Sequence, residues 1–191
     1  MIITILAEPR SGSSSLAGWF GFQKNFTILL EPMNPDMKSN GSYKDGISPK
    51  LWQYDTPYLL VKEICYEHRK HIPELISLSD KVILLYRINK KEQLESWLNA
   101  NETNNWNMEW DSNNVKITDE IIKTNYFNNT MNLFENDYLK KDVFFKISYE
   151  DLYYKDGFKR VLEYLNIDEL NNKPFPYNRK LKKSYEYKKI I

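Results

Sequence analysis

A serine-rich loop with one arginine and one glycine carries the clearest chemical signal in the sequence. It consists of Pro9, Arg10, Ser11, Gly12, Ser13, Ser14 and Ser15. An apolar stretch typical of a buried strand precedes it, and a helical pattern follows it. A strand that leads through such a loop into a helix turns several backbone N–H groups toward one point, so we expect the loop to hold a phosphate-like anion. The loop is not a Walker A motif, because no Gly-Lys-Ser/Thr follows it.

An arginine and a serine further along have the spacing of a second anion site. Arg87 follows the apolar run Lys81–Tyr86, and Ser96 lies about two helical turns further along. The fork of N–H donors on arginine matches phosphate oxygens, so the two side chains can hold one anion if the helix folds back over the sheet edge. The alternative is an exposed arginine at a strand end and a serine on a solvated helix face.

Two other segments place functional groups at the ends of expected strands. Glu31 follows the run Phe26–Leu30, where its carboxylate can face the same crevice and take a proton from an acceptor hydroxyl. The alternative for Glu31 is an ion pair with a nearby lysine. Ser148 or Asp151 suits the cap of the helix after the last expected strand. Tyr149, at the tip of that strand, can lie against a nucleotide base.

The hydrophobic pattern predicts an α/β fold. Near-continuous apolar runs alternate with helical patterns, which is typical of a parallel sheet covered on both faces. The expected strands are Ile2–Ala7, Phe26–Leu30, Tyr58–Ile64, Lys81–Tyr86 and Val143–Ile147. The expected helices are Ser13–Gly21, Glu67–Leu78, Lys90–Asn101, Thr118–Leu139 and Asp156–Leu165. Ligands bind such sheets at the carboxyl ends of the strands, where the serine-rich loop lies.

Length and composition fit a single domain over residues 1–191. Of these residues, 41% are hydrophobic and 15% aromatic. The net charge of +1 lacks the basic excess typical of nucleic-acid-binding proteins. No secretory signal pattern is present and no apolar run is long enough to span a membrane. We therefore expect a cytoplasmic protein with neither a membrane nor a nucleic acid as partner.

The single cysteine, Cys65, excludes an internal disulfide, and its apolar neighbours indicate a buried thiol. His68, His71 and Cys65 lack the spacing of metal ligands. Three segments, 32–57, 101–114 and 171–191, fit no regular element, and loops of this length are often lids or binding loops. For the basic tail at 171–191, a binding role and a mobile segment are equally consistent with the composition.

These motifs together resemble the sulfotransferases that use 3′-phosphoadenosine 5′-phosphosulfate (PAPS). The loop from Pro9 to Leu16 is similar to the family's 5′-phosphosulfate loop, and Arg87 and Ser96 match its 3′-phosphate-binding arginine and serine. Leu30-Glu31-Pro32 resembles the Glu-Pro of carbohydrate sulfotransferases, and residues 148–152 (Ser-Tyr-Glu-Asp-Leu) resemble a further family element.

The segment Gln93-x-x-Ser96-x-x-x-Ala100, with Trp106 beyond it, is most similar to bacterial trehalose-type sulfotransferases. The chain departs from the family in several places, one of them Arg10, which replaces the lysine of many members. Leu16 stands where cytosolic members have a tryptophan, and the interval from Arg87 to Ser96 is one residue longer than usual.

The resemblance implies a three-layer fold of the P-loop type, with a central parallel sheet of about five strands flanked by helices. It also implies PAPS as sulfuryl donor, adenosine 3′,5′-bisphosphate as product, and no required metal. Arg10 and the residues Ser11 to Ser15 would hold the 5′-phosphosulfate, Arg87 and Ser96 the 3′-phosphate. Glu31 would act as general base. Lys62 either adds positive charge at the site or forms an ordinary ion pair.

The expected acceptor is a hydroxyl on a carbohydrate or another small molecule. Trp106, Trp110 and the aromatic residues around Tyr43 to Tyr58 suit either a wall against a sugar ring or ordinary packing. Two alternatives stay open. One is an ATP-dependent P-loop kinase of small molecules, which would need Mg²⁺ and leaves the Arg87–Ser96 pair unexplained. The other is a non-catalytic nucleotide-binding module of the same fold.

Overall fold

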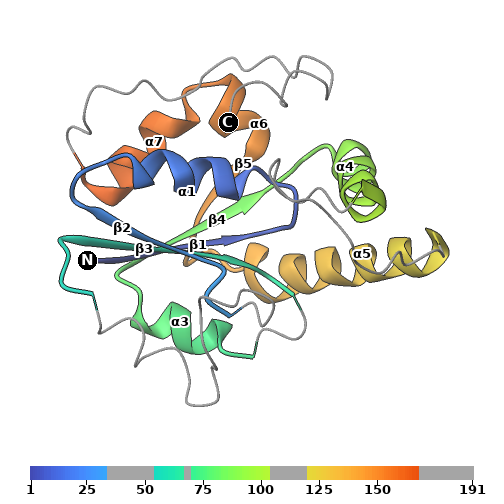
Figure 1. Ribbon diagram of the computed structural model, residues 1–191, viewed down its shortest axis with the longest axis horizontal. Coiled ribbons are helices and arrows are strands. Elements are labelled where there is room, and N and C mark those ends of the chain that lie inside the picture. Colours follow the sequence, from blue (N-terminus) through green and yellow to red (C-terminus); the bar gives the residue numbers. More distant parts are fainter. Residues whose placement is uncertain (34–53, 67–69, 104–119, 168–191) are drawn as a thin grey trace.

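A five-stranded parallel sheet forms the centre of the protein in the computed structural model, which describes residues 1–33, 54–66, 70–103 and 120–167 (Figure 1). The strands are β1 (Ile2–Ala7), β2 (Phe26–Leu30), β3 (Tyr58–Ile64), β4 (Lys81–Tyr86) and β5 (Phe145–Ser148). They are arranged in the order β2-β3-β1-β4-β5, and every neighbouring pair is parallel. The predicted α/β fold with five parallel strands is therefore confirmed.

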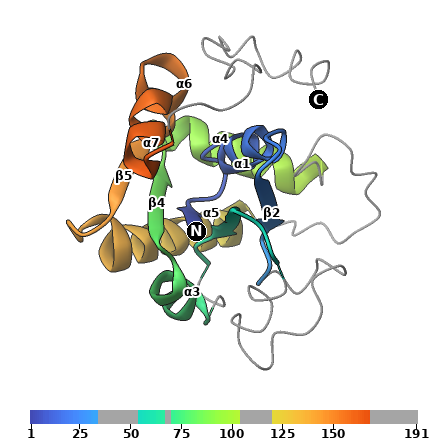
Figure 2. The ribbon, with the colours of Figure 1, turned by 90° about the vertical axis from the view of Figure 1, so that its left-hand side faces the viewer.

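Helices cover both faces of this sheet. On one face lie α1 (Ser13–Gly21), α6 (Tyr149–Tyr154) and α7 (Gly157–Leu165), and on the other lie α3 (Ile72–Leu78) and α5 (Glu120–Phe134) with its π-helical continuation η2 (Glu135–Leu139). Figure 2 shows the same separation after a quarter turn. The remaining helix, α4 (Lys90–Thr103), packs on α5 through Trp97, Phe127 and Met131.

The central strand shows why the apolar runs form buried strands. Along β1, Ile3 and Ile5 pack toward α1, while Leu6 packs toward α3, and all three are fully buried. Side chains on successive residues point to opposite faces of a sheet. A strand covered on both sides must therefore be apolar at nearly every position.

The predicted starts of one helix and one strand are wrong by two residues or more. The helix expected from Glu67 begins at Ile72, because Pro73 is tolerated only in the first helical turn, and Lys70 and His71 form a turn before it. The strand expected from Val143 begins at Phe145, since Val143 lies in a turn and is 80% exposed. The helical end predicted at Leu139 is confirmed, although the helix changes to π-helical geometry after Phe134.

The buried thiol predicted at Cys65 is confirmed. The residue is completely buried, and this burial, together with the nearby carboxylates of Asp137 and Glu63, raises the pKa of the thiol to about 12. Cys65 is therefore protonated at neutral pH and packs as a small apolar group rather than as a nucleophile.

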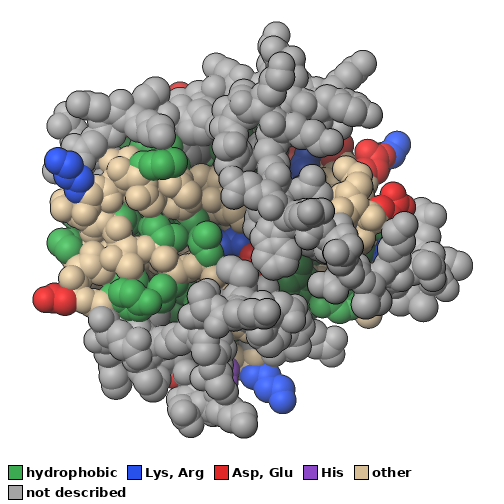
Figure 3. All heavy atoms as spheres, viewed as in Figure 1, with side chains coloured by type: hydrophobic (Ala, Val, Ile, Leu, Met, Phe, Trp, Pro, Cys, Tyr) green, Lys and Arg blue, Asp and Glu red, His purple; other side chains and the backbone are tan. Residues whose placement is uncertain are grey.

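No helix in the described ranges is both long and apolar enough to cross a membrane. On the face seen in Figure 3, the described Lys and Arg side chains are scattered and lie among Asp and Glu side chains. This arrangement agrees with the net charge of +1.

Two glycines provide opposite tests of the packing. Gly157→Ala should lower the free energy of unfolding by about 1–3 kcal/mol, because a Cβ there would meet the backbone oxygen of Asp151 at 2.5 Å and Cα of Leu152 at 2.8 Å. Gly18→Ala, in the exposed interior of α1 with no atom within 4 Å of the new Cβ, should raise it by about 0.5–1 kcal/mol. Urea unfolding measures both values, and a shift of the same sign in both variants would contradict this packing.

Candidate anion-binding site

The loops that follow β1 and β4 begin side by side. These strands are hydrogen-bonded neighbours in which Ala7 is opposite Leu85, and the Glu8 N–H continues the pairing by donating to the Leu85 carbonyl at 3.1 Å. The chain leaves β1 toward β2 at one edge of the sheet and leaves β4 toward β5 at the other. A parallel sheet forms a crevice at such a switch point, outside the carboxyl ends of its strands.

The serine-rich loop is a tight turn between β1 and α1. Arg10 and Gly12 both have left-handed backbone geometry, with φ of 61° and 82°. For a non-glycine residue this conformation costs about 1–3 kcal/mol, and such strain is concentrated at functional sites. The buried Ser11 hydroxyl donates to the Glu8 carbonyl at 2.7 Å. Gly12 is the N-cap residue of α1 and makes no side-chain cap hydrogen bond, so the first N–H groups of the helix face the loop.

Two tyrosines of α6 contact this loop. The Tyr153 hydroxyl donates to the Gly12 carbonyl at 2.8 Å. A Cβ on Gly12 would lie 2.8 Å from the rings of both Tyr149 and Tyr153, so only glycine fits. Tyr149 is 6% exposed, and its contact with a base stays a prediction. The predicted cap by Ser148 is confirmed, because its Oγ accepts a hydrogen bond from the Asp151 N–H at 3.0 Å.

Arg87 is nearly buried at the end of β4. Its guanidinium carbon lies 4.8 Å from the centre of the Tyr149 ring, and one terminal nitrogen donates to Glu92 Oε2 at 2.6 Å. Arg87 Nε is buried and has no hydrogen-bond partner among the described residues. The guanidinium thus already holds one carboxylate at its outer end.

Ser96 reaches the same crevice but bonds to the other arginine. The Arg10 Nε donates to Ser96 Oγ at 3.0 Å, which joins the serine-rich loop to α4. Within the described part of the chain, Arg87 hydrogen-bonds to Glu92 rather than to Ser96. The structure therefore brings Arg10 and Ser96 together, whereas the shared grip of Arg87 and Ser96 on one anion stays a prediction.

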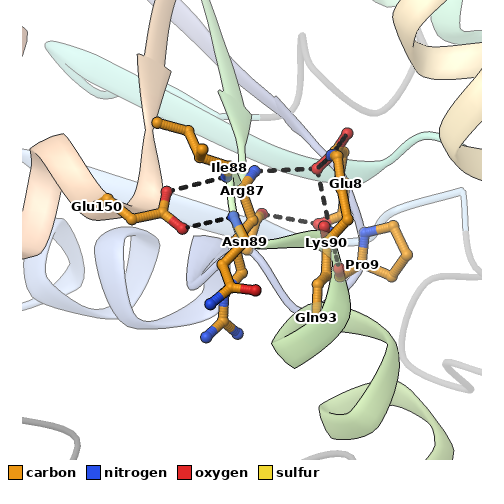
Figure 4. A network of polar contacts seen from close by, with 9 residues as sticks. Glu8, Pro9, Arg87, Ile88, Asn89, Lys90, Gln93 and Glu150 are labelled. Atoms are coloured by element: carbon orange, nitrogen blue, oxygen red, sulfur yellow. Dashed lines mark hydrogen bonds and ion pairs between the residues drawn. The ribbon is translucent and has the colours of Figure 1, made fainter.

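Glu8 joins the two loops and was missed in the sequence (Figure 4). Its carboxylate is 1% exposed and accepts hydrogen bonds from the Arg87 N–H at 3.0 Å and Gln93 Nε2 at 3.1 Å. It also pairs with Lys90 Nζ, which lies 2.5 and 2.6 Å from its two oxygens. Gln93 donates in addition to the Pro9 carbonyl at 2.8 Å. The only sequence signal was an acidic residue directly after an apolar strand, which equally suits an exposed position.

A second carboxylate holds the start of α4 from the opposite side. Glu150 of α6 accepts hydrogen bonds from the N–H groups of Ile88 and Asn89, both at 3.0 Å. In Figure 4 the segment 87–89 lies between Glu150 and Glu8. The turn that carries Arg87 is therefore fixed by carboxylates on both sides.

Glu31 and Lys62 form an ion pair at the neighbouring strands β2 and β3. Glu31 has a left-handed φ of 45°, and its N–H donates to the Lys62 carbonyl at 2.7 Å. Lys62 is 2% exposed, so the ammonium group orients the Glu31 carboxylate from within the protein. The ion pair expected as the alternative for both residues is present.

The described residues contain no group of three or more His, Cys, Asp or Glu side chains placed to hold a metal ion. Trp106, Trp110, Tyr43 and the tail at 171–191 lie outside the described residues, so the expectations for the acceptor wall and the tail stay untested.

No protein-family model matches the chain, and no curated protein matches its sequence significantly. Among solved structures, mouse sulfotransferase SULT7A1 complexed with PAP is similar, with a TM-score of 0.53 and 15% sequence identity over 90% of this chain. The chain has a sulfotransferase fold. It spans 60% of the length of the mouse protein. The sulfotransferase fold agrees with the three-layer α/β architecture predicted from the sequence.

Removal of the Tyr153 hydroxyl tests the support under the loop. Tyr153→Phe should lower the free energy of unfolding by about 1 kcal/mol, because the Gly12 carbonyl loses a hydrogen-bond donor. The same variant should weaken the binding of inorganic phosphate, measured by thermal shift. Tyr164→Phe is the matched control, since its hydroxyl bonds to Val82 at the other end of β4. If Tyr153→Phe left phosphate binding unchanged, as the control should, phosphate binding by the loop would not depend on the Tyr153 hydroxyl.

Proposed function

We propose that the chain is a sulfotransferase that moves a sulfuryl group from PAPS to a hydroxyl of a carbohydrate or another small molecule. The observation that carries this proposal is the pair of arginines at the ends of adjacent parallel strands. Arg10 lies in the loop after β1, Arg87 directly follows β4, and Glu8 connects the two segments. PAPS carries anionic groups at both ends, and the two arginines at this sheet edge could each bind one of them.

The residues present fit such a ligand. The N-terminus of α1 and Arg10 suit an anionic group at the 5′ end, because uncapped helical N–H groups favour negative charge. The Arg87 guanidinium holds the Glu92 carboxylate and has a buried Nε without a partner in the described ranges, so its surroundings accept an anion. The mouse protein of the same fold was solved with PAP, which supports a nucleotide of this type.

PAPS supplies the activated sulfuryl group. Arg10 and the loop amides from Ser11 to Ser14, with the hydroxyls of Ser13 and Ser14, would hold the 5′-phosphosulfate and stabilise charge on the oxygen that leaves. Ser15 would complete the 5′-phosphosulfate loop, Arg87 and Ser96 would bind the 3′-phosphate, and Tyr149 would lie against the nucleotide base. For Ser96 to bind the 3′-phosphate, its hydroxyl would have to exchange the hydrogen bond with Arg10 for one with the anion.

Glu31 is proposed as the general base. Its carboxylate would accept the proton that the acceptor hydroxyl loses, and Lys62 would hold it in position from the buried side. Resemblance to the carbohydrate and bacterial trehalose-type enzymes favours a sugar as acceptor. Glu31 directly follows β2, which β3 separates from β1, so the acceptor would bind outside the end of β3.

Nucleotide selectivity tests this proposal. Adenosine 3′,5′-bisphosphate should stabilise the protein against heat more than ATP with Mg²⁺, because it satisfies both arginines. At a concentration one hundred times Kd the gain is about 2.7 kcal/mol, which raises the Tm of a chain of this size by several degrees. Arg87→Ala should remove most of this gain.

Arg160→Ala is the matched control, since Arg160 of α7 lies over the Phe145 ring of β5 and should not affect nucleotide binding. If the bisphosphate gave no stabilisation, or no more than ATP with Mg²⁺, the sulfotransferase proposal would be wrong and a kinase would be favoured.

Loss of the proposed base should affect turnover rather than nucleotide binding. Glu31→Gln keeps the size of the side chain and is expected to lower kcat about 10²–10⁴-fold with the best acceptor from a substrate screen. Its Kd for adenosine 3′,5′-bisphosphate should stay the same. Transfer of radiolabelled sulfate from PAPS measures the rate, and a variant with normal kcat would exclude Glu31 as base.

A further inference from the structure

Glu8 stands out among the buried charged residues because its partners all come from one other segment. It is the first residue after β1, and its carboxylate takes donors only from Arg87, Lys90 and Gln93 among the described residues. Two of these donors are also nearly or fully buried. Glu8 therefore connects the end of one strand to the beginning of the helix after its neighbour (Figure 4).

The same connection determines where the two arginines lie. Arg10 is two residues beyond Glu8 in the loop, and the backbone N–H of Arg87 bonds directly to Glu8. Two further bonds cross between the same segments, from Gln93 to the Pro9 carbonyl and from Arg10 to Ser96. No other described carboxylate contacts both segments, since Glu150 bonds only to the side of Ile88 and Asn89.

We infer that Glu8 is a positioning residue that sets the separation of the two anion-binding loops for a ligand with two anionic groups. This inference rests on the proposed function. Glu8 acts through Arg87, Lys90 and Gln93 and does not itself touch the ligand.

A carboxylate at this position is electrostatically unfavourable for folding and for anion binding. It is buried, and its negative charge repels an anionic ligand bound next to it. Lys90, which is half-exposed, offsets the charge, and the backbone and amide donors satisfy the oxygens. What the carboxylate provides is geometry, because its two oxygens together hold three donors of the neighbouring segment.

The spacing of the loops matters most for a ligand that binds both. Two binding loops that contact one molecule act as a bivalent site. The second loop therefore adds affinity only when the separation of the loops matches the separation of the two anionic groups on the ligand. A ligand with one phosphate needs only one loop and is insensitive to the separation. This difference separates positioning from general support of the fold.

The experiment compares three nucleotides by calorimetric titration of the full chain: adenosine 3′,5′-bisphosphate, 5′-AMP and 3′-AMP. In Glu8→Gln the Kd for the bisphosphate should rise about tenfold, while the Kd for each monophosphate changes less than about threefold. Glu63→Gln is the matched control. Glu63 is equally buried and accepts N–H donors from Met33 and Ile64 rather than from the segments that carry the two arginines, so its loss should leave the ratio of affinities unchanged.

Lys90→Met provides a second variant if Glu8→Gln does not fold, because Lys90 is 46% exposed and the Arg87 N–H and Gln93 donors to Glu8 remain in place. It should lower the preference for the bisphosphate in the same direction, but less. Where Glu8→Gln folds and Lys90 acts through Glu8, the double variant Glu8→Gln/Lys90→Met should bind the bisphosphate no more weakly than Glu8→Gln alone.

An equal loss for all three nucleotides, unchanged affinities in Glu8→Gln, or additive losses in the double variant would each overturn the role of Glu8. A wild-type protein that binds the bisphosphate no more tightly than 5′-AMP would instead reject the proposed function, and with it this role.

Discussion

The parallel pairing of β1 with β4 is the constraint on which the site depends. Because Ala7 lies opposite Leu85, the loop with Arg10 and the turn with Arg87 start at the same edge of the sheet. Connections to β2 and β5 then leave in opposite directions and open the space between them. The helices on both faces make this register stable, since a shift by one residue would exchange the side chains of β1 that pack toward α1 with those that pack toward α3.

Several unfavourable features are concentrated at this edge. Arg10 and Glu31 have left-handed backbones, and Glu8 and Lys62 are charged groups inside the protein. Each is stabilised by specific partners rather than by solvent. A chain under selection only for stability would replace them with apolar residues and relaxed turns, because buried ion pairs rarely exceed the stability of good apolar packing. Their gathering at one edge is typical of a site that binds charge.

Elements buried on both faces could be predicted from the sequence, and the contacts between distant loops could not. The bounds of β1 to β4 follow from apolar runs between polar segments, whereas the start of β5 was misplaced because Val143 is apolar but exposed. The serine-rich loop was identified from its residue types. Its partners were not, since Glu8 and Arg87 are 79 residues apart and meet only through the strand order.

Phosphorus NMR of adenosine 3′,5′-bisphosphate titrated with the protein tests most directly whether the two loops form one site. We expect the 3′- and 5′-phosphate resonances to change together along a single saturation curve, because Arg87 and Arg10 would hold the two ends of one molecule. A response of the 5′-phosphate alone would describe a simple phosphate loop at α1, and no response at all would remove the nucleotide site. Either result would contradict the two-anion site.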